Sequence, residues 1–95
     1  MEPRLAEWMT PSDRDILDLL ANEGGRRELV LTPRLIADNT NWARDTVREH
    51  VVVLRDHGLI EYHDESAGIY QLSERGRAYL AGELAVSKLE TDDEA

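Results

Sequence analysis

The sequence predicts an α+β fold in which a helix-turn-helix leads into a β-hairpin. Three observations predict it. A short helix begins at Thr32 and breaks at a polar run, a longer helix with one apolar stripe ends at Gly58, and two short apolar runs between residues 59 and 72 flank a turn. We therefore expect a winged helix-turn-helix with three main helices, a small three-stranded antiparallel sheet and a C-terminal helix.

The first helix is predicted to begin at Thr10. Thr is a good N-cap, Pro11 suits the first helical position, and Asp13 places an acid at the third. The apolar side chains expected to face inward are Ile16, Leu17 and Leu20. We expect this helix to stop at Gly24–Gly25.

A loop and a short strand are expected next. Arg26 and Arg27 lie in the loop, where they could touch phosphate, although a solvated loop is the simpler interpretation. The apolar run over 29–31 predicts the first of three strands.

The first helix of the helix-turn-helix has Thr32 as its N-cap and Pro33 at its first helical position. Leu35 and Ile36 should supply its apolar side. The run Asn39-Thr40-Asn41 then breaks the helix. We expect its last residue to take the left-handed conformation that Gly more often adopts in such a turn.

The second helix of the motif is expected over residues 43–57. An apolar stripe at i, i+4 and i+7 should face the core, and consists of Val47, Val51 and Leu54. Roughly 80° around the helix runs a guanidinium row at i, i+4 and i+11, which consists of Arg44, Arg48 and Arg55. Packing on one side and fork-shaped donors on the next is the layout of a helix that reads the major groove. A solvated amphipathic helix with arginines on its polar side is the alternative.

The hairpin is predicted from strands over 59–63 and 69–72 that are joined by a loop over 64–68. A last helix is expected to open at Ser73 and to continue through Leu84.

The chain divides into an arm over 1–9, one domain over 10–89 and an acidic tail over 90–95 that we expect to fray. The arm contains Leu5 and Trp8, and a disordered segment seldom carries a Trp. We therefore expect part of the arm to pack on the domain or on a second subunit, with Trp8 as a plug at the end of the first helix as the simpler alternative.

The charge of the chain is unusual. Its 95 residues contain 20 Asp and Glu, ten Arg and a single Lys, for a net charge of -9. An acidic balance taken alone argues against nucleic acid. A chain with almost no Lys and many carboxylates is also typical of proteins kept soluble in concentrated salt, where at about 1 M the Debye length is roughly 3 Å. The alternative is an ordinary acidic protein that never meets DNA.

Several other classes of function find no support. Without Cys there is no disulfide and no Cys-ligated zinc, and no apolar run is long enough to span a membrane. No signal peptide is recognisable, so we expect a cytoplasmic protein. No phosphate loop, nucleophile elbow or Cys nucleophile is present, so we expect neither an enzyme nor a cofactor.

The His and Trp residues are interpreted structurally. His50, His57 and His63 lie seven and six residues apart, which does not suit a zinc site, and no metal is expected. We expect His50 to be packed and hydrogen-bonded beside the core stripe. Trp42 could stack on a base or a ligand, but a position in the core between the two helices of the motif is preferred.

Several stretches that cover about residues 8–84 together carry one resemblance. They are Trp8-Met9-Thr10-Pro11, Asn39-Thr40, Thr46-Val47, His57-Gly58-Leu59-Ile60, Gly68-Ile69-Tyr70-Gln71-Leu72 and Glu74-Arg75-Gly76-Arg77-Ala78-Tyr79-Leu80. In combination they resemble the winged-helix regulators of halophilic archaea that are similar to the phage phi-H repressor and related to the ArsR and MarR types. The resemblance implies a sequence-specific transcription factor, here expected to be a repressor, that binds double-stranded DNA, usually as a homodimer.

Two sets of site residues follow. The residues expected at DNA are Arg34, Ala43, Arg44, Asp45, Thr46, Arg48 and Arg55. Those expected at the dimer interface are Leu5, Trp8, Leu80 and Leu84. The expected wing tip, residues 64–67, lacks the Arg or Lys that a wing often places beside the DNA backbone, so affinity should rest on the recognition helix and on Arg34.

A different class of function remains as the alternative. The acidic wing and the negative net charge favour a winged helix that serves as a protein-protein interaction module and does not bind DNA.

Overall fold

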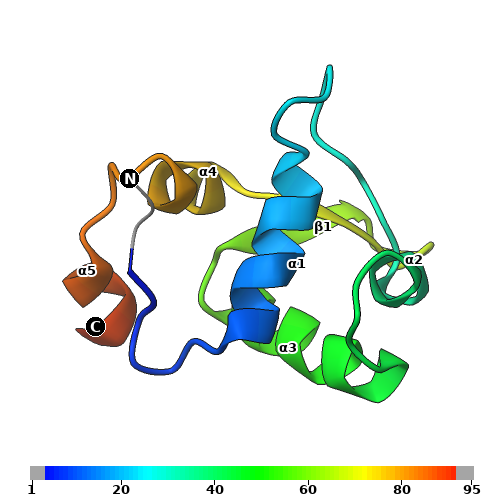
Figure 1. Ribbon diagram of the computed structural model, residues 1–95, viewed down its shortest axis with the longest axis horizontal. Coiled ribbons are helices and arrows are strands. Elements are labelled where there is room, and N and C mark those ends of the chain that lie inside the picture. Colours follow the sequence, from blue (N-terminus) through cyan, green and yellow to red (C-terminus); the bar gives the residue numbers. More distant parts are fainter. Residues whose placement is uncertain (1–3, 92–95) are drawn as a thin grey trace.

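The computed structural model describes residues 4–91, and within that range it has five helices and a two-stranded antiparallel sheet (Figure 1). The elements are α1 Pro11–Ala21, α2 Pro33–Asp38, α3 Arg44–Asp56, β1 Ile60–Asp64, β2 Ile69–Leu72, α4 Glu74–Leu80 and α5 Val86–Thr91. Residues 1–3 of the expected arm and 92–95 of the expected acidic tail lie outside the described residues.

Helix α1 begins as predicted and ends earlier than predicted. Thr10 is the N-cap, and the Asp13 carboxylate accepts a hydrogen bond from its backbone N–H at 2.8 Å. The helix ends at Ala21 and does not reach Gly24–Gly25, because Asn22 takes a left-handed conformation with φ 51°. Its N–H returns to carbonyls of the last turn, which closes the helix. The three apolar residues expected to face inward are fully buried.

The prediction of a strand over residues 29–31, and so of a three-stranded sheet, is wrong. Only Leu31 pairs with the hairpin, through two backbone hydrogen bonds with Tyr70 of 3.0 and 2.8 Å, so the sheet has two strands and one isolated bridge. The N–H of Leu29 is taken by the carbonyl of Leu20 at the end of α1, at 2.8 Å. On the other side of the bridge, Thr32 already caps α2, so no further residue is left to extend the ladder.

Helix α2 begins where predicted, but the side that it exposes to solvent is not the predicted one. The Thr32 hydroxyl accepts from the N–H of Leu35 at 3.2 Å, and Pro33 opens the helix. Ile36 is fully buried as expected, whereas the Leu35 side chain is 44% exposed, so its predicted place on the apolar side is wrong. A helix of six residues turns only one narrow side to the core.

The turn between α2 and α3 is not built on a left-handed residue. Among residues 4–91 the only non-glycine with positive φ is Asn22, so the conformation expected for Asn41 is wrong. The turn is instead closed by Thr40, whose N–H donates to the Ala37 carbonyl at 3.2 Å and whose hydroxyl accepts from the N–H of Trp42 at 3.3 Å.

Helix α3 is placed as predicted, with Ala43 as N-cap and His57 as C-cap. The predicted core stripe is at most 1% exposed and consists of Val47, Val51 and Leu54. Gly58, with φ 78°, then turns the chain into β1. The apolar face of α3 thus packs against α1, α2 and β1, and its other faces turn to solvent.

The hairpin matches the prediction to within one residue. Strands β1 and β2 pair Tyr62 with Tyr70, and the register then shifts so that Asp64 pairs with Ile69. This β-bulge lies at the base of the turn and bends the strand there.

The predicted last helix ends earlier than expected, and a further helix that was not predicted follows it. Helix α4 is capped by Ser73, whose hydroxyl accepts from the N–H of Gly76 at 3.0 Å. It ends at Leu80, and Gly82 with φ 76° redirects the chain before α5 begins at Val86. A β-carbon added at Gly76 would lie 2.1 Å from the carbonyl oxygen of Leu59, so glycine is required where α4 crosses the start of the hairpin.

The arm packs on the same chain. The indole of Trp8 stacks on the His57 ring with centroids 3.8 Å apart, and its Nε1–H donates to the Leu89 carbonyl at 2.9 Å. The hydroxyl of Tyr79 donates to the Arg4 carbonyl at 2.9 Å. Residues near the two ends of the chain therefore meet beside the C-terminal end of α3, on the side of the molecule away from α2 (Figure 1).

We expect Leu54→Ala to lower the free energy of unfolding by about 2–5 kcal/mol, because it leaves a cavity in a fully buried site. Val52→Ala on the same helix is the matched control, since its side chain is 43% exposed and should cost about 0.5 kcal/mol or less. Urea denaturation followed by circular dichroism measures both. Equal effects of the two substitutions would mean that α3 is rotated from the orientation described.

Candidate nucleic-acid interface

The arginines of this acidic chain fall into two groups. In the first group, each guanidinium contacts a side chain or carbonyl that holds the fold: Arg4 with Glu90, Arg14 with Asp18, Arg55 with Tyr62, Arg75 with the carbonyls of His57 and Lys88, and Arg77 with Glu28. In the second group, the side chains are exposed and have neither ion pair nor hydrogen bond within residues 4–91: Arg26, Arg27, Arg34, Arg44 and Arg48.

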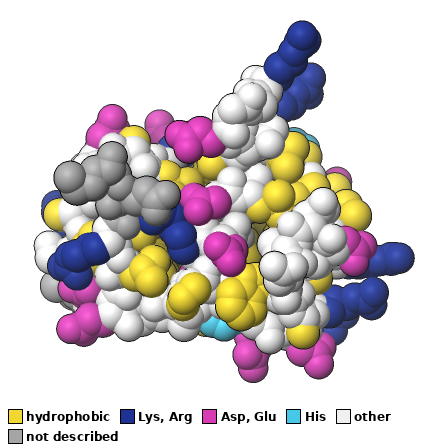
Figure 2. All heavy atoms as spheres, in the orientation of Figure 1, with side chains coloured by type: hydrophobic (Ala, Val, Ile, Leu, Met, Phe, Trp, Pro, Cys, Tyr) yellow, Lys and Arg dark blue, Asp and Glu magenta, His cyan; other side chains and the backbone are white. Residues whose placement is uncertain are grey.

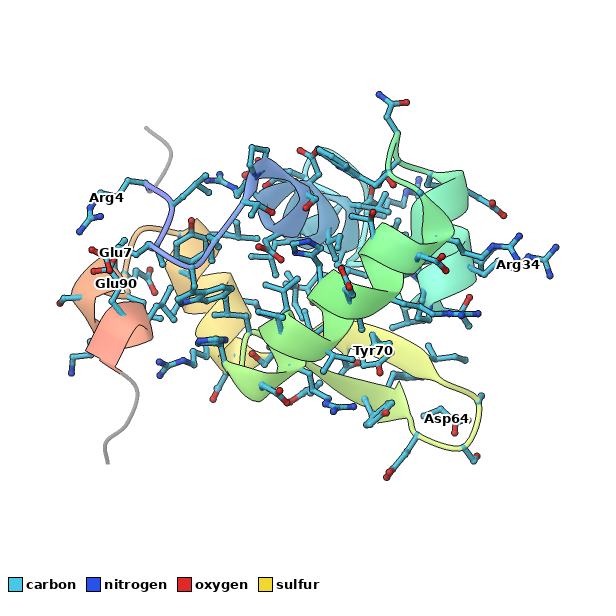
Figure 3. The ribbon with its side chains drawn as sticks, turned by 90° about the horizontal axis from the view of Figure 1, so that it is seen from below. Arg4, Glu7, Arg34, Asp64, Tyr70 and Glu90 are labelled. Carbon is cyan, nitrogen blue, oxygen red and sulfur yellow. The ribbon has the colours of Figure 1, made fainter. Side chains whose placement is uncertain are left out.

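The second group lies in two places. Arg34 on α2 with Arg44 and Arg48 on α3 form what we call the arginine face. Arg26 and Arg27 lie in the loop that follows α1, which projects from the body in Figure 1 and carries cationic side chains at its tip in Figure 2. Figure 3 shows Arg34 projecting outward at the end of the molecule where Asp64 of the hairpin also lies.

The expected row on α3 is broken at Arg55. Its Nη1 donates to the Tyr62 hydroxyl at 2.9 Å, and its Cζ lies 5.4 Å from the centroid of that ring. Its Nη2 lies 3.7 Å from the Asp56 carboxylate, and the side chain is 35% exposed. The structure therefore leaves Arg34, Arg44 and Arg48 as unpaired cations on two adjacent helices, and places Arg55 against the hairpin.

An acidic row that the sequence interpretation missed runs along α3 beside the arginines. Asp45, Glu49 and Asp56 are exposed and recur at i, i+4 and i+11, the same spacing as the arginine row. At about 100° per residue the two rows lie roughly 100° apart on the helix. The spacing was present in the sequence, where the high content of carboxylates obscured it. The solvent side of α3 is therefore of mixed charge.

The remaining residues expected at DNA lie at the start of α3. Ala43 is the exposed N-cap, Asp45 is an exposed acid of the first turn, and Thr46 is half-buried.

Trp42 supports the base of this surface from within. Its indole packs against the hydrophobic core, as expected, and its Nε1–H donates to the Asp15 carboxylate of α1 at 2.8 Å. The ring is thus held by α1 just before α3 begins.

His50 is packed and hydrogen-bonded, as expected. Its Nδ1 lies 2.7 Å from Oδ1 of Asp13, whose side chain is fully buried at the start of α1. The pair joins the middle of α3 to α1 on the flank opposite the arginine face.

The hairpin tip, residues 64–68, offers acceptors and no cation. Hydrogen bonds from the Ser66 hydroxyl at 2.9 Å and from the Ala67 N–H at 3.2 Å lower the pKa of the Asp64 carboxyl and close the turn. Glu65 beside it is exposed. The tip therefore keeps its negative charge at neutral pH, in line with the absence of Arg and Lys in its sequence.

All four residues expected at a dimer interface are half-buried against the core of their own chain: Leu5, Trp8, Leu80 and Leu84. Leu80 and Leu84 each also line an open depression beside α4, of about 230 Å³ at Leu80 and about 660 Å³ at Leu84. Part of the apolar surface of α4 is thus left uncovered in the single chain.

Two kinds of feature are absent from the described residues. Between residues 4 and 91, no three His, Asp or Glu side chains converge as metal ligands would. No helix in that range is long and apolar enough to cross a membrane.

The family is decided by comparison with known proteins. A family model described as a winged helix-turn-helix phage repressor matches residues 1–92. The chain belongs to this phage repressor family. The repressor protein of Halobacterium phage phiH is 43% identical to it over 89 residues, which are 92% of this chain and 96% of that protein.

A solved relative has the same fold. The crystal structure of the PhiH1 repressor-like protein from Haloarcula marismortui matches with a TM-score of 0.69 and 28% sequence identity, over 88% of this chain and 90% of that one. The resemblance drawn from the sequence and the winged-helix fold class are thereby confirmed. Membership of a phage repressor family supports a regulatory role, and this family is not one of enzymes.

Proposed function

We propose that this member of the phage repressor family is a sequence-specific transcriptional repressor that binds double-stranded DNA in the cytoplasm and reads the major groove with α3. One observation carries the proposal. In a chain with net charge -9, the arginine face keeps three guanidinium groups without partners among the described residues. Such groups are ready to donate to guanine or to phosphate.

The mixed charge of α3 suits the reading of bases better than general adhesion to DNA. Arg44 and Arg48 can each donate two hydrogen bonds to guanine, and Asp45 and Glu49 can accept from the amino group of cytosine. The same carboxylates repel phosphate. A DNA sequence that places no hydrogen-bond donor opposite them is therefore bound more weakly. Sequence discrimination then comes from both the donors and the acceptors of one helix.

A symmetric dimer would present two copies of α3 to a palindromic site, with half-sites about one helical turn apart. The uncovered apolar surface at Leu80 and Leu84 supports an interface at α4, and Leu5 and Trp8 extend it in our proposal.

A second candidate is a winged helix that binds another protein and not DNA. The acidic hairpin tip and the 44% exposure of Leu35 on α2 favour it. Binding to the DNA upstream of the chain's own gene, measured in high salt, separates the two.

We expect Arg44→Ala and Arg48→Ala each to weaken operator binding by about 1–3 kcal/mol and to leave the fold intact, because each removes an exposed donor to a base. Arg26→Ala and Arg27→Ala are matched controls, since they remove the same charge from an exposed loop away from the arginine face. Fluorescence anisotropy with operator DNA measures all four. Wild-type affinity in both α3 variants would show that α3 is not the reader.

We expect operator affinity to stay flat or to rise between about 0.5 M and 2 M KCl. A basic binder loses affinity with a slope near -0.9 per phosphate neutralised, but here added salt also screens the repulsion between 20 carboxylates and the duplex. Anisotropy at several salt concentrations, with circular dichroism alongside, measures it. A steep loss of affinity by a folded protein contradicts this account of the acidic surface.

We expect a dimer at about micromolar concentration in high salt, where screening favours apolar contacts. Leu84→Glu should shift the mass measured by light scattering toward the monomer. Leu35→Glu adds the same charge to another exposed apolar site and should not. A monomeric wild-type protein under these conditions would count against the interface at α4.

A further inference from the structure

The contacts of Arg55 differ in kind from those of the arginine face. Arg34, Arg44 and Arg48 have no partner among residues 4–91, whereas Arg55 donates to the Tyr62 hydroxyl and lies over its ring. A guanidinium that donates to a tyrosine hydroxyl and lies over its ring is held toward that ring, so turning it to DNA would cost part of both contacts. Arg55 is therefore poorly placed as a direct ligand of DNA, although its spacing puts it in the same row.

Tyr62 is the point at which the hairpin is held. It lies on β1 immediately before the β-bulge, so its position sets the direction in which the tip leaves the sheet. Its ring stacks on that of Tyr70 with centroids 4.7 Å apart, and Tyr70 is the residue that bridges to Leu31. Figure 3 shows Tyr70 between α3 and the hairpin.

The set Arg55, Tyr62 and Tyr70, which we call the hairpin clamp, joins the hairpin to the two helices that carry the arginine face. Arg55 ties the last turn of α3 to β1, the ring stack ties β1 to β2, and the bridge to Leu31 ties β2 to the residue before the N-cap of α2. Beyond the clamp the hairpin tip carries Asp64 and Glu65. Any rotation of the hairpin about its base therefore moves two carboxylates relative to the helices proposed to meet DNA.

We propose that Arg55 is a positioning residue: through Tyr62 it fixes the acidic hairpin tip at a set distance from the DNA backbone, and it does not itself contact DNA. This inference rests on the proposed DNA-binding function. With the clamp intact the carboxylates are held away from the phosphates. With the clamp open, the tip samples positions in which it repels them, and operator affinity falls.

The test compares three substitutions with Arg48→Ala by anisotropy, at the lowest salt at which circular dichroism shows a folded protein. Arg55→Met removes the donors and keeps the aliphatic stem, and should weaken operator binding roughly tenfold. Tyr62→Phe removes the hydroxyl that accepts from Arg55 and keeps the ring, and should give a smaller loss. Arg55→Lys retains the charge and one donor, and should restore part of the affinity.

Two further readouts separate positioning from contact. Loss of a phosphate ligand changes the slope of log affinity against log salt by about 0.9, whereas the slope for Arg55→Met should be that of wild type. In a background in which the tip is neutralised by Asp64→Asn and Glu65→Gln, the effect of Arg55→Met should shrink to roughly twofold or less. Asn can still accept the hydrogen bonds that close the turn at position 64.

Each of three results overturns the inference. The first is wild-type operator affinity for Arg55→Met. The second is a change in the salt slope of Arg55→Met as large as the loss of a phosphate ligand gives. The third is a loss of affinity from Arg55→Met that is undiminished in the neutralised background. If Arg55→Met does not fold, Arg55→Lys and Tyr62→Phe carry the same comparisons. Failure of the proposed function is distinguishable, because Arg44→Ala and Arg48→Ala would then bind the operator DNA like wild type.

Discussion

A buried carboxylate sets the orientation of α3. Asp13 is fully buried, and its oxygens accept from the Thr10 backbone N–H, from the Thr10 hydroxyl at 3.2 Å and from Nδ1 of His50. An uncompensated charge in such a place costs several kcal/mol, so the three donors are required together. Because one donor belongs to α3, this requirement fixes how α3 is rotated against α1. The arginine face lies on the other flank, and its direction follows from that rotation.

Pairing within the fold also distinguishes the arginines from one another. Five arginines have guanidinium groups that contact carboxylates, a tyrosine hydroxyl or backbone carbonyls. Three of them, Arg4, Arg75 and Arg77, join segments that are distant in sequence. In a chain so rich in carboxylates, an arginine left without a partner is notable, because acceptors are abundant on every side. Three such residues lie on two adjacent helices, α2 and α3, and the solvent side of α3 between and beside them is of mixed charge.

Local signals in the sequence predicted the local structure. The caps at Thr10 and Thr32, the stripe through Val47, and the hairpin depend on neighbours a few residues away, and the structure confirms them. Two of the features that failed depend on distant partners, whereas the early end of α1, the conformation of Asn41 and the exposure of Leu35 are local features that the sequence signals also missed. The third strand was lost because the N–H of Leu29 belongs to α1, and the row on α3 was broken because a tyrosine of β1 lies within reach of Arg55. Neither contact can be predicted from the residue pattern within one helix. The acidic row could have been found, since its spacing is that of the arginine row. Roles at DNA and at a dimer interface for the selected residues stay predictions.

The meeting of the arm with α5 has a consequence for the order in which the protein can assemble. Trp8 donates to a carbonyl 81 positions further along the chain, and the backbone N–H of Glu7 to the carboxylate of Glu90, 83 positions further. Neither acceptor exists until the ribosome has made nearly all of the domain. The helix-turn-helix can form earlier from nearby contacts, but its last turn gains the indole stack on His57 only when the arm has a partner to hold it. A nascent chain arrested before α5 would lack both of these acceptors, and of the printed contacts of the arm only the bond from Tyr79 of α4 to the Arg4 carbonyl would remain to hold it against the later part of the chain. The end of α3 would then be less firmly covered, and quality-control proteases would meet an unfinished product.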